Sequence, residues 1–154
     1  MLARIAAVTE PNRPAQHLRE ALDDYRRKGQ INLVDLISLN VEKTLEYISP
    51  AGVVVPTVSG HTARMISRFK LPVWIIAVSP QEATCQHLQF AYGVYPWCEK
   101  KYPLDWNTFA RKLRRTRGMA GKLFVLTEGP SPRNPKANHR LEIIDLDRAE
   151  KRAR

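Results

Sequence analysis

The sequence predicts a three-layer α/β/α domain whose sheet has five or six mostly parallel strands. Two observations carry this prediction. Residues 51–55 and 72–78 are continuous apolar runs rich in β-branched side chains, which is typical of strands buried on both faces. Segments with apolar residues three and four positions apart, typical of amphipathic helices, alternate with such runs, as in βαβ units. The length, 154 residues, is that of one domain.

The first half of the chain shows this alternation in order. Gly29 and Pro50 are the signals that end two successive helices. The expected elements are a strand over residues 5–8, helices over 15–28 and 32–48, a strand over 51–55 and a helix over 63–69.

The second half continues the pattern. Ser79 and Pro80 suit the N-cap and first turn of a helix that we expect to reach about Tyr92. The other expected elements are strands over 72–78, 93–96, 122–127 and 141–146, a basic helix from Asp105 or Asn107 to Arg117, and a proline-rich loop over 128–137. The last strand is a candidate for an antiparallel edge strand. We expect one domain over residues 1–146 and a frayed, charged tail over 147–154.

The net charge of +10 is unevenly distributed along the chain. Residues 101–154 contain 14 basic and 6 acidic residues, which gives a local net charge of +8. This excess predicts an anionic partner: a phosphorylated metabolite, a nucleic acid or an acidic protein surface. No apolar run approaches the ~20 residues of a membrane span, so we expect no membrane partner and a cytoplasmic location. Cys85 and Cys98 form no disulfide framework or zinc spacing, and we interpret them as packing residues.

A loop of hydroxyl residues follows the strand at 51–55. Thr57, Ser59 and Thr62 surround Gly60, and a helix begins directly afterwards. Ligands collect at the carboxyl ends of parallel strands, and the free N–H groups at a helix start suit a phosphate. The alternative is that Ser59 is only an N-cap and Gly60 only a turn residue. The loop lacks the lysine of a P-loop, which argues against an ATPase.

Residues 53–64, Ser-Arg-Phe at 67–69, the strand at 72–78 and Gly-Val-Tyr-Pro at 93–96 resemble the C-terminal α/β domain of pyruvate kinases. Residues 122–129 and 138–144 resemble the last two strands of that domain, so the resemblance covers about residues 33–146. The first 30 residues are instead similar to small stand-alone proteins related to this domain.

The resemblance implies a regulatory domain without its kinase. In the family, catalysis belongs to a TIM barrel of about 250 residues, which this chain cannot contain. We therefore expect no pyruvate kinase activity, no catalytic residue, no metal and no cofactor.

The resemblance also implies a site for a phosphorylated effector, in many members a sugar bisphosphate. By motif position, the first phosphate would contact Thr57, Ser59, Gly60, His61 and Thr62. Val58 stands where some members have a lysine. The second phosphate would meet Trp106, with Arg111 nearby and Arg133 in the loop before the last strand. That loop is proline-rich where the family is glycine-rich, which leaves a monophosphate or a nucleotide as alternatives.

Three other functions stay open. The chain could be an interaction subunit that pairs with another protein or with a second copy. It could be a small enzyme that uses His61 or Glu128 as an acid or base. Binding of nucleic acid through the basic run at 111–117 is less favoured, because few aromatic residues interleave with the cations.

Overall fold

The computed structural model describes residues 16–130 and 135–151, and the strand expected at residues 5–8 lies outside these ranges. The chain divides after Ile31 into two compact units, residues 1–31 and residues 32–154. In the first unit, helix α2 (Gln16–Arg27) forms where the apolar spacing predicts it. The second unit, called the main unit below, contains all the strands and the remaining helices of the described residues.

The main unit is built on a five-stranded sheet with the order β3-β2-β1-β4-β5. Strands β1 (Gly52–Pro56), β2 (Trp74–Ser79), β3 (Val94–Cys98) and β4 (Leu123–Glu128) are parallel. Strand β5 (Arg140–Asp145) pairs with β4 in the antiparallel sense at one edge. The predicted α/β fold with a mostly parallel sheet is therefore confirmed, and so is its antiparallel last strand.

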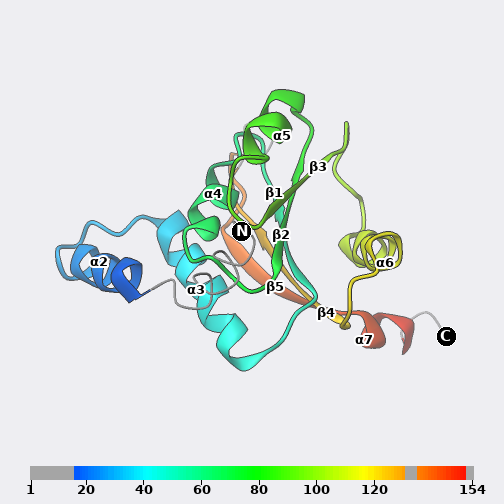
Figure 1. Cartoon of the computed structure of the whole chain (residues 1–154), viewed down its shortest axis with the longest axis horizontal. Helices are drawn as coiled ribbons and strands as arrows, with labels where there is room; N and C mark the ends of the chain where they lie inside the picture. Colours follow the sequence, from blue (N-terminus) through cyan, green and yellow to red (C-terminus); the bar gives the residue numbers. More distant parts are fainter. Residues whose placement is uncertain (1–15, 131–134, 152–154) are drawn as a thin grey trace, which may run out of the picture. The chain divides into compact units, whose positions relative to one another are not determined.

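Helices cover both faces of this sheet (Figure 1). Helices α3 (Leu33–Tyr47) and α4 (His61–Ser67) lie on one face, and α6 (Trp106–Arg117) lies on the other. This placement follows from the strand order. The chain moves outward from β1 to β3 and then returns past β1 to β4, and a right-handed crossover in the reverse direction places its helix on the opposite face.

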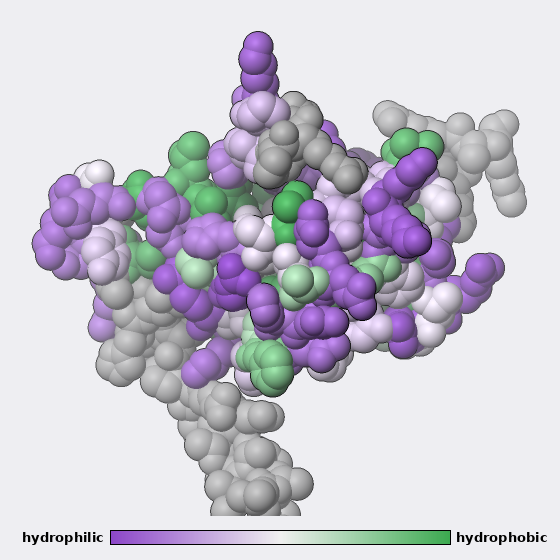
Figure 2. Space-filling view, turned by 90° about the horizontal axis from the view of Figure 1, so that it is seen from above, coloured by the Kyte–Doolittle hydropathy of each residue, from purple (hydrophilic) through white to green (hydrophobic). Residues whose placement is uncertain are grey.

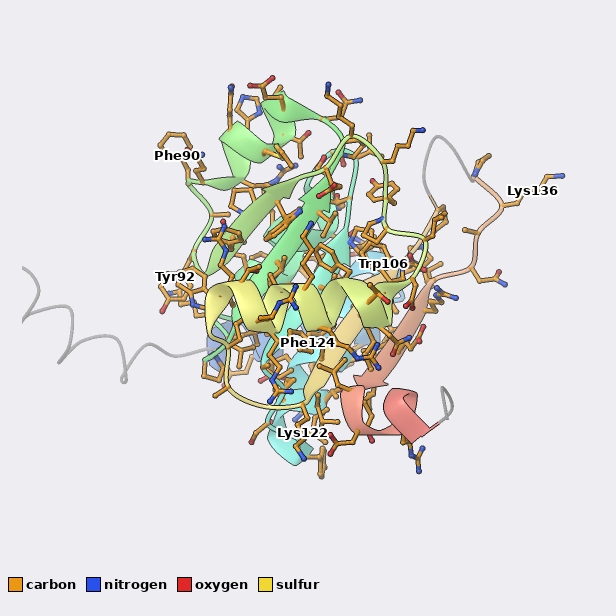
Figure 3. The ribbon with its side chains drawn as sticks, turned by 90° about the vertical axis from the view of Figure 1, so that its right-hand side faces the viewer. Phe90, Tyr92, Trp106, Lys122, Phe124 and Lys136 are labelled. Carbon is orange, nitrogen blue, oxygen red and sulfur yellow. A yellow bond between two sulfur atoms is a disulfide. The ribbon has the colours of Figure 1, made fainter. Side chains whose placement is uncertain are left out.

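The core beneath α6 fixes that helix on the sheet. Phe109 and Leu113 of α6 belong to one buried cluster with Phe124 and Leu126 of β4. Figure 3 shows Phe124 behind the middle of α6. Burying each of these large apolar side chains contributes about 2 kcal/mol, so the orientation of α6 is strongly determined.

The outer surface is mainly polar. Figure 2 shows hydrophilic side chains over most of the face seen from above, with hydrophobic residues in small separate patches. None of the helices described by the structure has the length and apolar character required to cross a membrane.

Several boundaries differ from the sequence prediction; helix α4, for example, begins and ends two residues earlier than expected. Helix α5 (Glu82–Leu88) is shorter than expected, because Ser79 is the buried last residue of β2 rather than an N-cap. The Ser79 hydroxyl accepts a hydrogen bond from the Gln81 N–H at 3.2 Å. Strand β3 continues past residue 96 to Cys98. The expected tail begins as helix α7 (Leu146–Lys151), which is anchored by the buried side chain of Leu146.

The interpretation of the two cysteines as packing residues is wrong, because they form a disulfide between α5 and the end of β3. Their Cα atoms are 6.1 Å apart, within the usual range for a disulfide. The cause is the β2–β3 register, which pairs Ser79 with Cys98 and so places Cys98 beside the start of the connection to α5. This proximity depends on strand pairing and has no local sequence signal.

We expect this disulfide to stabilise the main unit. Closing a chain segment whose ends are 13 positions apart stabilises a fold by about 3 kcal/mol, chiefly by restricting the unfolded chain. Cys98→Ser should lower the free energy of unfolding in urea by about that amount. A dithiol reductant should lower the wild type to the level of the variant and leave the variant unchanged. Equal stability of the oxidised wild type and the variant would contradict the prediction.

Candidate functional site

A pocket of about 760 Å³ lies where β1 and β4 end. Its walls come from the loop after β1, the start of α6, the end of β4 and the segment that leads into β5. The order in which the chain adds strands reverses between β1 and β4. From β1 the chain continues outward to β2, whereas it reaches β4 by the return crossover. Open α/β sheets bind ligands at such a switch point, so the fold itself marks this pocket as the candidate site.

The loop after β1 is organised by its own hydroxyl groups. Thr57 Oγ1 accepts a hydrogen bond from the Gly60 N–H at 2.9 Å, and Ser59 Oγ accepts one from the His61 N–H at 3.4 Å. Gly60, rather than Ser59, is the N-cap of α4, with φ at 76°. Each hydroxyl still has its own proton to donate, so holding the loop does not use up its capacity to bind an anion.

Helix α5 supports this loop from behind. Thr84 Oγ1 donates a hydrogen bond to the Val58 carbonyl at 2.7 Å. A Cβ atom on Gly60 would lie 3.0 Å from Leu88 Cδ2 and 2.9 Å from Arg64 Nη1. A side chain at position 60 would therefore be strained by the positive φ and would crowd Leu88. The role of Gly60 in the described structure is to shape the loop.

The opposite wall is built around a carboxylate. Trp106, at the start of α6, donates from Nε1 to Glu128 Oε1 at 2.9 Å. Arg140 forms an ion pair with the other oxygen of Glu128 across the β4–β5 pairing. Figure 3 shows Trp106 at the end of α6 that lies toward β5. Among the described lining residues Glu128 is the only carboxylate, and Arg140 neutralises it.

A buried hydroxyl without a partner lies beside the pocket. Thr127 on β4 is 1% exposed, and its Oγ1 has no hydrogen-bond partner among the residues that the structure describes. It lines a small adjoining cavity of about 10 Å³ together with Thr62 and His139. Native proteins rarely leave buried polar atoms unpaired, so this hydroxyl indicates a place for a water molecule or a ligand group.

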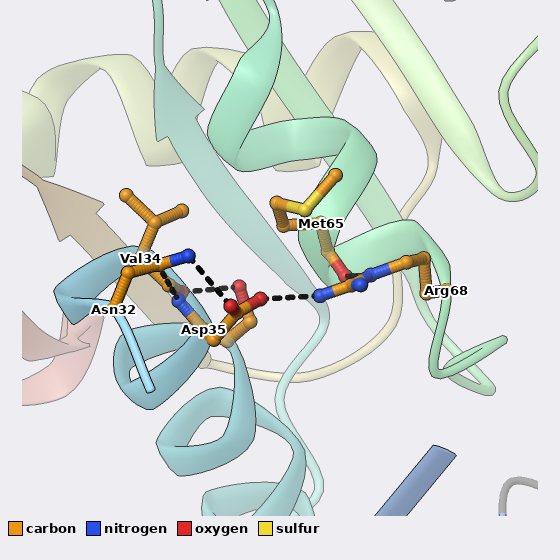
Figure 4. Close-up of polar contacts among 6 residues, drawn as sticks. Asn32, Val34, Asp35, Met65 and Arg68 are labelled. Atoms are coloured by element: carbon orange, nitrogen blue, oxygen red, sulfur yellow. Dashed lines mark hydrogen bonds and ion pairs between the residues drawn. The ribbon is translucent and has the colours of Figure 1, made fainter. Parts of the chain in front are cut away.

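Figure 4 shows how α3 and α4 are held together beside this pocket. Asp35, in the first turn of α3, accepts hydrogen bonds from Asn32 Nδ2 at 2.7 Å and from Arg68 Nη2 at 2.5 Å. Arg68 also donates to the Met65 carbonyl of α4 at 3.3 Å. The neighbouring Val34 lines the pocket. The Asp35–Arg68 pair thus connects the two helices that border the site.

Most of the predicted site residues come together. The pocket is lined by Thr57, Ser59, His61, Thr62 and Trp106, whereas Gly60 shapes the loop and does not line it. Arg111 is half-buried on α6 and is not among the lining residues, and Arg133 lies outside the described residues.

Several neighbours of the pocket were not predicted from the sequence, namely Thr127, Asn138, His139 and Arg140. Thr127 alone has a local signal, as a hydroxyl near the carboxyl end of an otherwise apolar strand. No cluster of three potential metal ligands occurs among the described residues.

The comparisons with known proteins agree with this architecture. The family model "Pyruvate kinase, alpha/beta domain" matches residues 35–144. The chain belongs to this family. The pyruvate kinase of Thermococcus litoralis is 39% identical over 101 residues, which cover 64% of this chain and 21% of that protein. The pyruvate kinase of Staphylococcus aureus strain USA300 is 31% identical over 119 residues, 75% of this chain and 20% of that protein.

A solved structure shows the same fold. The pyruvate kinase of Cryptosporidium parvum, in complex with ADP, superposes with a TM-score of 0.66 at 17% sequence identity. The superposition covers 75% of this chain and 24% of that one. The chain thus spans about a fifth of the length of the curated pyruvate kinases that it matches.

The start of α6, which positions Trp106, depends on Asp105. Asp105 is the N-cap and accepts hydrogen bonds from the Asn107 and Thr108 N–H groups, both at 3.0 Å. The hydrogen bond from the Thr108 hydroxyl is the largest cause that lowers the pKa of Asp105 to about 2, and the amide donors add to it. The carboxylate is therefore the form that caps the helix at neutral pH.

We expect Asp105→Ala to lower the free energy of unfolding by about 1 kcal/mol at pH 7. Because the folded pKa lies below the unfolded value of about 3.9, this contribution is complete above pH ~4 and is lost as the pH falls toward 2. Denaturant unfolding at several pH values should show the two proteins converging over that interval. Asp105→Asn, an equally good N-cap, should keep most of the stability at neutral pH. A stability difference between the wild type and the Asp105→Ala variant that does not change with pH would contradict the assignment.

Proposed function

We propose that the main unit binds a phosphorylated metabolite, a sugar phosphate or a nucleotide, in the pocket at the ends of β1 and β4. We further propose that binding is regulatory rather than catalytic. The observation that carries the proposal is that the hydroxyl loop lines this pocket at the switch point of the sheet, while the Thr127 hydroxyl, which has no partner among the described residues, lines a small cavity that adjoins it. Phosphate oxygens are acceptors, and these groups are donors.

The available donors suit one phosphate group. The hydroxyl of Thr62 makes no hydrogen bond within the described residues, and Ser59 and His61 are exposed in the pocket. Arg140 supplies a guanidinium whose side chain is 54% exposed, whereas the side chain of its partner Glu128 is 26% exposed. The guanidinium is therefore accessible, and a phosphate would compete with Glu128 for it.

The charge of the described lining favours a monophosphate over a bisphosphate. Arg140 and Glu128 offset each other, Val58 provides no charge, and Arg111 is not among the lining residues. The remaining titratable groups of the described lining besides Tyr102 are His61 and His139. The aromatic side chains of Tyr102 and Trp106 provide a wall for the organic part of the ligand.

A regulatory role is supported by the elements that the ligand would join. The pocket connects the loop after β1, which α5 supports, with the start of α6 and the segment before β5. A ligand bound between these elements would restrict their relative movement, and a ligand that binds one arrangement better than another shifts the population toward it.

Phosphorylated ligands should raise the melting temperature, and the loop hydroxyls should be required. We expect ribose 5-phosphate or AMP, at about 100 times its Kd, to stabilise the wild type by about 2.7 kcal/mol, a shift of roughly 5–10 °C. The double substitution Ser59→Ala and Thr62→Ala should abolish this shift. Ser49→Ala, an exposed serine that is not among the lining residues, is the matched control and should retain it. If no sugar phosphate, nucleotide or inorganic phosphate shifts the wild type, the proposal fails.

Thr127→Val should have opposite effects on stability and on binding. The variant removes an unpaired buried hydroxyl without changing the side-chain shape, so the free protein should be as stable as the wild type or up to about 1 kcal/mol more stable. The same change should reduce the ligand-induced shift. Thr116→Val is the control and should leave that shift unchanged. The Thr116 hydroxyl donates a hydrogen bond to the Lys112 carbonyl within α6. A fully retained ligand shift in the Thr127→Val protein would show that this hydroxyl plays no part in binding.

A further inference from the structure

A second pocket, of about 500 Å³, lies at the opposite edge of the sheet, where β1 and β2 begin and α6 ends. We propose that it binds a small apolar molecule that carries a single anionic group, of the class of aromatic carboxylates. This proposal is independent of the phosphate site, because the two pockets share no lining residue.

The walls of this pocket are mainly apolar. The lining includes the consecutive residues Pro72, Val73 and Trp74, together with Pro50 and Met119. Trp74 is 57% exposed, which is unusual for so large an apolar side chain. Exposed apolar surface that lines a concave site is typical of a ligand-binding cleft, and the volume is in the range of known small-molecule pockets.

One fixed cation stands in this apolar setting. The Arg117 guanidinium carbon lies 4.7 Å from the centre of the Tyr95 ring and 5.7 Å from that of Trp97. Arg117 also donates a hydrogen bond to the Tyr95 hydroxyl. These contacts hold the side chain in place without neutralising it, because Arg117 makes no ion pair within the described residues and no carboxylate lines the pocket. An anionic group is therefore the complement that the pocket lacks.

The end of α6 shapes the remaining wall. Gly118 ends the helix in the left-handed conformation, with φ at 60°, and the chain then turns so that Met119 lines the pocket. Gly52 leaves room for this side chain, since a Cβ there would lie 3.0 Å from Met119 Cε. Trp106, labelled in Figure 3, begins α6 beside the first pocket, and Arg117 is the last residue of the same helix. Twelve helical residues separate these ends by about 16 Å.

A pair of dyes tests the proposal. 8-Anilinonaphthalene-1-sulfonate has two aromatic groups and one sulfonate, and N-phenyl-1-naphthylamine has the same rings without the charge. Both fluoresce more strongly when bound to apolar surface, so titrations of the native protein give both affinities. We expect the sulfonate to bind about tenfold more tightly than the neutral dye, as for a charge-assisted hydrogen bond.

Substitutions locate the site. Arg117→Gln should lower the affinity for the sulfonate to that for the neutral dye, and Arg117→Lys, which keeps the charge, should retain most of the preference. Trp74→Ala should lower the affinity for both dyes at least fivefold. Arg115→Gln is the matched control, an exposed arginine on the same helix that is not among the lining residues, and it should change neither affinity. Circular dichroism of each variant would establish that it is folded.

Three results would overturn the inference. Equal affinity of the wild type for the two dyes would remove the anionic preference. An equal loss of sulfonate binding in Arg115→Gln and Arg117→Gln would show a general surface-charge effect. Loss of sulfonate binding in the Ser59→Ala, Thr62→Ala protein would place the dye in the first pocket. Because the readout uses no phosphate compound, failure of the phosphate proposal would leave this test unaffected.

Discussion

The constraint on which the structure depends is that β1 is hydrogen-bonded on both sides and covered on both faces. It pairs in parallel with β2 and with β4, and Val53, Val54 and Val55 are completely buried. The end of such a strand is fixed in position and direction, because neighbours hold it on every side. The loop at residues 57–60 therefore starts from a fixed position, and α4, α5 and the end of β4 can be built around it.

The return crossover has a second consequence, because it makes α6 the only described helix that contributes to both pockets. Its buried side, formed by Phe109, Ala110 and Leu113, holds it against the sheet. Trp106 is then presented at one end and Arg117 at the other. The same apolar contact thus positions an indole beside a carboxylate at one edge of the sheet and a guanidinium over aromatic rings at the other.

The parts of the fold and site that depend on local signals could be predicted from the sequence. The apolar runs predict β1 and β2, and the residue types at 57–60 predict the loop after β1, although α4 begins at His61 rather than after residue 62. Arg111 is not among the lining residues, because the inward-facing positions of α6 are 109, 110 and 113. Arg140 and the disulfide could not be found, because each depends on a strand register, Glu128 with Arg140 and Ser79 with Cys98.

The hydroxyl loop and the opposite wall have different roles in the proposed phosphate complex. Thr57 and Ser59 already accept hydrogen bonds from the loop amides, so their contribution is to donate protons from a conformation that the free protein has already adopted. Such a preorganised loop loses little entropy on binding, but it adds no charge. Arg140 is the only lysine or arginine among the described lining residues, and it is held in an ion pair by the partly buried Glu128. Affinity would then depend on how completely Arg140 leaves Glu128, whereas the position of the phosphate would depend on the loop. Arg140 lies on β5, and the loop follows β1. These two strands flank β4, which contributes Glu128 and Thr127. The group that would attract the phosphate and the loop that would position it therefore lie on opposite sides of β4.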